Sequence, residues 1–147
     1  MYCSLSDIKK RISEQEITRL VADGGTAVDF DDPDDPGLLL VTAAIESATT
    51  EIDFACAVKY PVPLSPVPAR VTDLCVDISI YNLFKRRFRE IPELIVKQYD
   101  DARKELGEIA KGNRVLDITI PEGEISSSDV AVSKTESDRT YNLDGYM

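Results

Sequence analysis

The chain has 147 residues, of which 43% are hydrophobic and 30% are charged, and its formal net charge is −10. This length and composition are typical of one soluble globular domain with a modest core. The sequence contains no histidine, which excludes Ser/His and Cys/His nucleophilic catalysis, histidine general-base chemistry and most zinc or iron sites. The negative charge disfavours nonspecific binding of nucleic acid by the whole surface. Composition therefore favours a protein that is not an enzyme.

The cysteines and the N-terminus indicate which cellular compartment and which structural cross-links to expect. Cys3, Cys56 and Cys75 form no C-x-x-C pair, so neither a disulfide scaffold nor a zinc ribbon is expected. Cys56 and Cys75 lie within apolar helical patterns, which is typical of small core residues. No apolar run approaches the length of a membrane span, and the N-terminus lacks the features of a signal peptide. We expect a cytoplasmic origin, no cofactor, no metal and no membrane partner.

Two short helices are predicted at the start of the chain. The first is capped by Ser4 or Ser6 and runs to about Arg11. The second starts at a capping box formed by Ser13 and Glu16 and stops at the Asp-Gly-Gly of residues 23–25. Their apolar positions are Leu5, Ile8 and Ile12 in the first helix, and Ile17, Leu20 and Val21 in the second.

An acidic loop follows, with five aspartates at positions 29, 31, 32, 34 and 35. Clustered carboxylates are typical of calcium loops. The EF-hand register fails, however, because Pro33 occupies the fifth position and Asp34 replaces the glycine of the sixth. A solvated loop is favoured, with Asp34 and Asp35 near the positive end of the next helix.

Two long helices are predicted on either side of a proline-rich stretch, residues 61–68. Its four prolines exclude a helix or a central strand, so the stretch is predicted to be a stiff corner. The preceding helix spans about 36–59 and the following one about 68–88. The first has a single stripe of apolar residues, at positions 38, 41, 45, 48, 52 and 55. The second is apolar on several faces, which indicates a central helix or contact with another subunit.

A basic cluster, Lys85, Arg86, Arg87 and Arg89, ends the second of these helices. Cations at a helix C-terminus complement the helix dipole, but four in five positions exceed that need. They suit an anion or nucleic-acid patch, or a contact with an acidic neighbour. Because the chain is acidic overall, a subunit contact is favoured over DNA binding.

A fifth helix is predicted over about 92–111, with Gly112 as the residue that ends it. Residues 115–120 then alternate and predict a short strand whose apolar side is Leu116, Ile118 and Ile120. No second strand is predicted to pair with it, so these residues are expected to contact another copy or a partner. Residues 121–147 are rich in Ser, Asp and Glu and would be disordered alone.

The predicted fold is mainly α: a compact bundle of about five helices, two short and three long, with a C-terminal extended arm containing one short strand. Residues 1–112 form the helical domain. Residues 113–147 form the arm, which we expect neighbouring subunits to order.

Two motifs resemble a known family. The opening, Met1 to Ile12 (MYCSLSDIKKRI), and the corner, Lys59 to Pro68 (KYPVPLSPVP), are similar to the Mu-like prophage gene-product-thirty-six family of tailed-phage neck proteins. The DISIYNL of residues 77–83 and the helix near Tyr99 extend the similarity over about residues 1–112. The acidic loop and the C-terminal tail are variable parts of this family's pattern, so the resemblance implies nothing about them.

The resemblance implies a head–tail connector subunit that forms a homo-oligomeric ring below the portal of a tailed phage. The implied partners are the portal protein, tail-side neck or terminator proteins, and packaged DNA that passes without sequence-specific contact. The implied location is the neck of the virion, after assembly in the bacterial host cytoplasm. The family supplies no catalytic residues. An acidic channel wall would let DNA slide through without adhering.

Two other function classes stay open. One is a small acidic protein-binding module, for example a partner-blocking or antitoxin-like protein, which would be monomeric or dimeric. The other is an enzyme, which would need carboxylate pairs that converge in a pocket. The spacing suggests no such pair, and Glu46, Glu51 and Asp53 are better explained as a solvated helix face.

Overall fold

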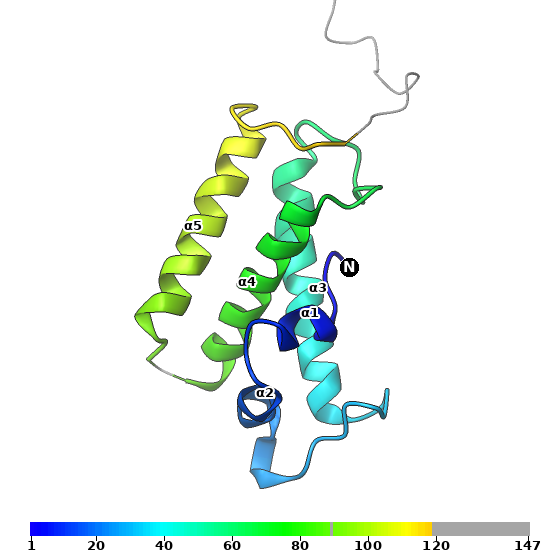
Figure 1. Ribbon diagram of the computed structural model, residues 1–147, viewed down its shortest axis with the longest axis vertical. Coiled ribbons are helices and arrows are strands. Elements are labelled where there is room, and N and C mark those ends of the chain that lie inside the picture. The colour runs from blue at the N-terminus through cyan, green and yellow to red at the C-terminus, as the bar shows by residue number, and fades with distance from the viewer. Residues whose placement is uncertain (89, 119–147) are drawn as a thin grey trace, which may run out of the picture.

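The computed structural model describes residues 1–88 and 90–118, which form a helical bundle. Three long helices run side by side, and two short helices both pack against the middle one (Figure 1). The predicted mainly-α fold with two short and three long helices is confirmed. The elements are α1 (Leu5–Lys9), α2 (Glu14–Val21), the 3₁₀ turn η1 (Asp23–Gly25), α3 (Pro36–Cys56), α4 (Ala69–Arg87) and α5 (Glu93–Ala110).

Helix α4 is the centre of the core, since it contacts α1, α2, α3 and α5. Its apolar residues are buried on every face, among them Val71, Leu74, Ile78, Ile80 and Leu83. The apolar faces that suggested a neighbouring subunit are therefore covered within the domain. Of the two explanations that the sequence allowed, the central helix is the one the structure supports.

Polar side chains start the helices where the sequence predicted. Ser4 and Asp7 form a reciprocal capping box at α1. At α2 one half of the predicted capping box is present, because the Ser13 hydroxyl accepts the backbone N–H of Glu16. Asp35 is the N-cap of α3, and its carboxylate accepts the backbone N–H of Gly37 at 2.7 Å. These caps satisfy N–H groups that lack partners within the helix.

The proline corner is fixed by the N-terminal segment. Helix α3 ends at Cys56, three residues before the predicted end at Lys59. Leu64, in the middle of the corner, is buried, and its N–H donates to the hydroxyl of Tyr2 at 2.8 Å. The Tyr2 hydroxyl in turn donates to the Asp53 carboxylate on α3. The two motifs that carry the family resemblance therefore contact each other directly.

The segment after α5 belongs to the helical domain. Gly112 has a φ of 80°, a conformation that glycine adopts easily, and it turns the chain back over the end of the bundle. Leu116 is then buried in the core, and its N–H donates to the Tyr60 hydroxyl at 2.9 Å. Residues 115–118 form no strand. The predicted boundary at residue 112 thus falls before the last core residue that the structure describes.

Ile120 and the remainder of the predicted arm lie outside the described residues. Within residues 1–88 and 90–118, the helices are too short or too polar to cross a membrane.

Candidate functional site

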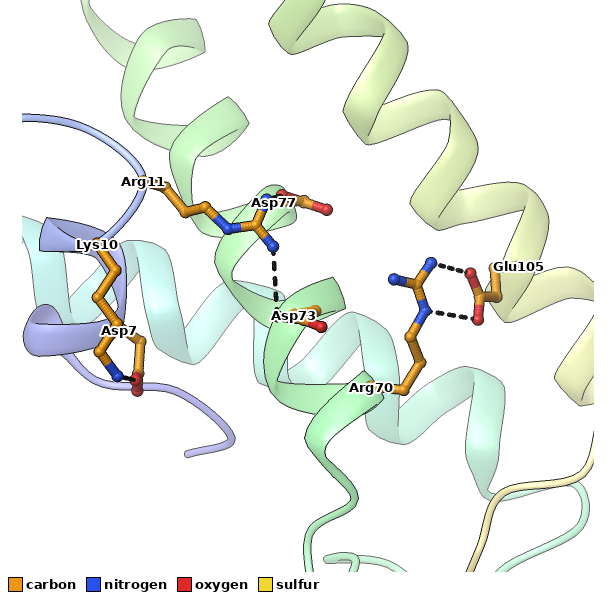
Figure 2. Close-up of polar contacts among 7 residues, drawn as sticks. All are labelled: Asp7, Lys10, Arg11, Arg70, Asp73, Asp77 and Glu105. Atoms are coloured by element: carbon orange, nitrogen blue, oxygen red, sulfur yellow. Dashed lines mark hydrogen bonds and ion pairs between the residues drawn. The ribbon is translucent and has the colours of Figure 1, made fainter.

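A stripe of charged residues along one face of α4 forms ion pairs with the segment after α1 and with α5. Figure 2 shows Arg11, just after α1, reaching Asp73 and Asp77, at 3.3 and 3.4 Å. At the start of the same helix, Arg70 pairs with Glu105 of α5 through two hydrogen bonds. The positions 70, 73 and 77 lie on one helical face. The charges of this stripe therefore hold the domain together.

The pKa values of two carboxyl groups in these ion pairs, Glu105 and Asp77, differ from their ordinary values. The hydrogen bond from Arg70 holds the pKa of Glu105 below its ordinary value, and a hydrogen bond from Arg114 lowers it further. Burial raises the pKa of Asp77, although the charge of Arg11 opposes this effect.

The basic cluster has a role within the domain that sequence reasoning missed. Arg86 and Arg87 both bind the carboxylate of Asp23, at 2.7 and 2.8 Å, and so join the end of α4 to the turn after α2. Lys85 is exposed at the same end, and Arg89 lies outside the described residues. Two of the four cations therefore share one carboxylate of their own domain.

The acidic loop is organised by its own backbone. Asp29 accepts the N–H of Asp31, Asp32 accepts that of Asp34, and Asp35 accepts that of Asp29, each at 3.0 Å. The hydrogen bond from the Asp29 N–H holds the pKa of Asp35 below its ordinary value. Within the part of the chain described, no three metal-ligating side chains gather at one point. The carboxylates thus shape the loop and cap α3.

All three cysteines are free and buried, as the sequence predicted for Cys56 and Cys75. Burial raises the pKa of the Cys56 thiol to about 11. The sulfur atoms of Cys3 and Cys75 lie 3.8 Å from the Ser79 hydroxyl and 3.9 Å from the Thr49 hydroxyl, respectively. These thiols are packing residues of the core.

An apolar groove lies open on the surface between α3 and α5. It has a volume of about 240 Å³. Phe54 of α3 is 85% exposed there, and Val58, two residues past the end of α3, is 66% exposed. Two large apolar side chains exposed at one site are unusual. Its other apolar lining residues are Ala55, Leu106, Gly107 and Ala110. We call this site the α3–α5 groove.

Polar and aromatic side chains border the groove. Arg103 of α5 pairs with Glu51 of α3 at 3.5 Å and also lies over the ring of Tyr99. The Tyr99 ring stacks on Tyr81 of α4, with centroids 3.8 Å apart. The rim of the groove is therefore in contact with all three long helices.

Sequence reasoning did not find this groove. It followed the buried stripe of α3 and treated Glu51 and its neighbours as a solvated face. The missed signal was the position of Phe54 and Val58, which lie four residues apart and off the stripe. An aromatic residue on the polar face of an amphipathic helix is a hint of an interface.

The predicted contact residues of the C-terminal segment fall in different environments. Leu116 is 6% exposed and therefore occupied within its own domain, while Ile118 is half-buried against the core. Ile120 lies outside the described residues. That Ile118 and Ile120 contact a neighbouring subunit stays a prediction.

The described residues thus form a small all-α domain in which most arginines pair with carboxylates of the same chain and the α3–α5 groove is exposed. Residues 2–134 match the family described as Bacteriophage Mu, Gp36, and the chain belongs to this family. Membership indicates a phage structural protein. Comparison with curated protein sequences gave no match. The family match confirms the resemblance and runs beyond residue 112, where we expected the similarity to end.

Proposed function

We propose that this protein is a structural, non-enzymatic subunit of a tailed-phage neck. It forms a homo-oligomeric ring below the portal and connects the head to the tail. The observation that carries the proposal is the family match over residues 2–134. The proposed position at the neck of the particle comes from the resemblance of residues 1–12 and 59–68 to tailed-phage neck proteins.

The structure offers a surface for such an assembly. Arg11, Arg70, Arg86 and Arg87 are committed to carboxylates of their own domain, so these charges hold the subunit together more than they recruit neighbours. The α3–α5 groove exposes Phe54 and Val58 instead. An exposed aromatic anchor with a polar rim is a common composition for a protein interface.

In this proposal the ring contacts the portal on one side and tail-side neck or terminator proteins on the other. Packaged DNA passes through its channel without sequence-specific contact. A formal net charge of −10 suits a wall that repels phosphates. The protein is incorporated into the virion neck after assembly in the host cytoplasm.

The test is a phage in which the gene for this chain is deleted. We expect DNA-filled or emptied heads and separate tails in electron micrographs, with joined particles restored by the wild-type gene. Antibody labelling of purified virions should place the chain at the head–tail junction. Normal particles without the chain, or its absence from purified virions, would refute the proposal.

A small acidic protein-binding module is the alternative, and the exposed groove suits it as well. The mass of the purified chain separates the two, measured with and without other particle proteins. A ring supports the neck subunit. A monomer or dimer that binds one basic host protein, and never enters particles, supports the module.

A further inference from the structure

The floor of the α3–α5 groove contains a glycine that the domain itself does not explain. Gly107 lies inside α5, three residues before its end at Ala110, where glycine is among the least favourable residues. A Cβ built at this position meets no atom within 4 Å. Packing inside the domain therefore does not require a glycine. Its φ is also not positive, so no turn requires it.

The rest of the groove is consistent with a partner that approaches closely. Ala55 and Ala110 add two more small residues to the floor, next to Phe54 and Val58 on the wall. Small residues let a foreign backbone come near the helices, and the exposed aromatic ring supplies an anchor beside it. The groove thus suits a narrow, extended segment with small apolar side chains.

The same chain contains such a segment after the described residues. Val130-Ala131-Val132 is the longest apolar run after Ile118, and it lies within the range that the family match covers. In an extended conformation Val130 and Val132 point to the same side. The 12 residues from Ile118 to Val130 span at most roughly 40 Å, so a groove on an adjacent subunit is within reach.

The direction in which the chain leaves the domain favours a neighbouring copy. Residues 114–117 run along a hollow on the α4–α5 side, next to Pro68, Arg70 and Glu105. The α3–α5 groove opens between a different pair of helices. To enter its own groove the chain would have to turn back around the end of the bundle, and we therefore infer that the groove it enters belongs to another copy.

We propose that Val130–Val132 of one copy binds the α3–α5 groove of the next, with Gly107 as the position where the two backbones approach. The contact is heterologous, because the donor surface and the acceptor surface differ, and repeated contacts of this kind form a ring when the rotation between copies closes. The inference rests on the proposed function in naming a ring as the product, but it concerns the contact alone.

The test uses the full-length chain and measures self-association by analytical ultracentrifugation. Phe54→Asp, and separately the double variant Val130→Asp/Val132→Asp, should each weaken self-association by roughly thirty-fold or more. Leu39→Asp is the matched control, because Leu39 is 53% exposed on α3 and outside the groove. It should associate like the wild type. Circular dichroism verifies that each variant is folded.

Mixing the two defective variants decides whether the contact lies between copies. A groove variant still has its segment and a segment variant still has its groove, so the mixture should regain one wild-type contact per pair. If the mixture stays monomeric while both variants are folded, the segment binds its own domain or another partner, and the proposal is wrong.

Gly107 gives an independent measurement. Gly107→Ala should raise the melting temperature, because alanine favours the helix and the added Cβ has room. Gly107→Leu should leave the domain folded and weaken association as Phe54→Asp does. Unchanged association of Gly107→Leu overturns the proposal. A chain that is located in the neck, yet shows no dependence on these residues, would refute this contact and leave the proposed function standing.

Discussion

Tyr2→Phe removes the hydroxyl that connects three parts of the chain. This hydroxyl accepts the N–H of Leu64 in the proline corner at 2.8 Å and donates to Asp53 of α3. Leu64 is only 3% exposed, so its N–H loses its partner in a place that water reaches poorly. Leaving a buried donor unsatisfied costs about 1–3 kcal/mol. Asp53 is partly exposed, so water replaces much of its lost hydrogen bond.

We therefore expect Tyr2→Phe to lower the free energy of unfolding by about 2 kcal/mol. For a domain of this size the melting temperature should fall by roughly 8 °C. Circular dichroism at pH 7 monitors both assays: urea denaturation gives the free energy of unfolding, and thermal denaturation gives the melting temperature. Tyr99→Phe is the control, because the Tyr99 hydroxyl makes one long contact, 3.4 Å from Glu51, and its loss should cost below about 0.5 kcal/mol.

The pH dependence of the same variant tests the reasoning again. Burial and then the hydrogen bond to Asp53 raise the pKa of Tyr2 to about 12, from an ordinary value of 10.0. Its contribution to stability is thus complete below pH 10 and is lost as the pH rises through 12, because the unfolded chain releases the proton first. The difference between wild type and Tyr2→Phe should narrow over this range. Equal stability of the two proteins at pH 7 would refute the role of Tyr2.

Two further predictions concern carboxylates. Glu105→Gln should weaken the pairing with Arg70 and Arg114. Because the pKa of Glu105 is lowered in the fold, the stability that this carboxylate contributes is present above pH 4.5 and is lost as the pH falls. The free energies of unfolding of the two proteins, measured at decreasing pH, should therefore converge. Asp35→Ala should lower the melting temperature by removing the cap of α3, while Asp34→Ala should have a smaller effect, because its carboxylate does not cap the helix. A stability difference between wild type and Glu105→Gln that does not shrink in acid would contradict the role of Glu105. Equal melting temperatures of Asp35→Ala and Asp34→Ala would contradict the role of Asp35 as the cap.

Most of the helical framework could be predicted from the sequence. The 3–4 spacing of apolar residues marked the long helices, and Ser13, Asp35 and Gly112 marked places where helices start or end. Local rules suffice for these features, because capping and helix periodicity depend on residues a few positions apart. The prolines of residues 61–68 likewise excluded a helix from the corner.

Contacts between residues that are far apart in the sequence could not be predicted and became visible only in the structure. From the sequence we predicted a subunit contact at Arg86 and Arg87, and nothing in the sequence indicated that folding also places Asp23 beside them. It placed Leu116 on an exchanged strand, yet the turn at Gly112 directs this side chain into the core beneath Tyr60. The α3–α5 groove was missed because α5 forms half of it, and no local pattern relates Phe54 to Gly107.

The sequence by itself determined the helical class and, through its opening and corner motifs, the family. Only the tertiary structure decided which charges and apolar groups are satisfied within one subunit and which are left for a partner. The physical reason is that burial and ion pairing are properties of the assembled surface. Residues such as Arg86 and Phe54 acquire their roles from neighbours far away in the chain.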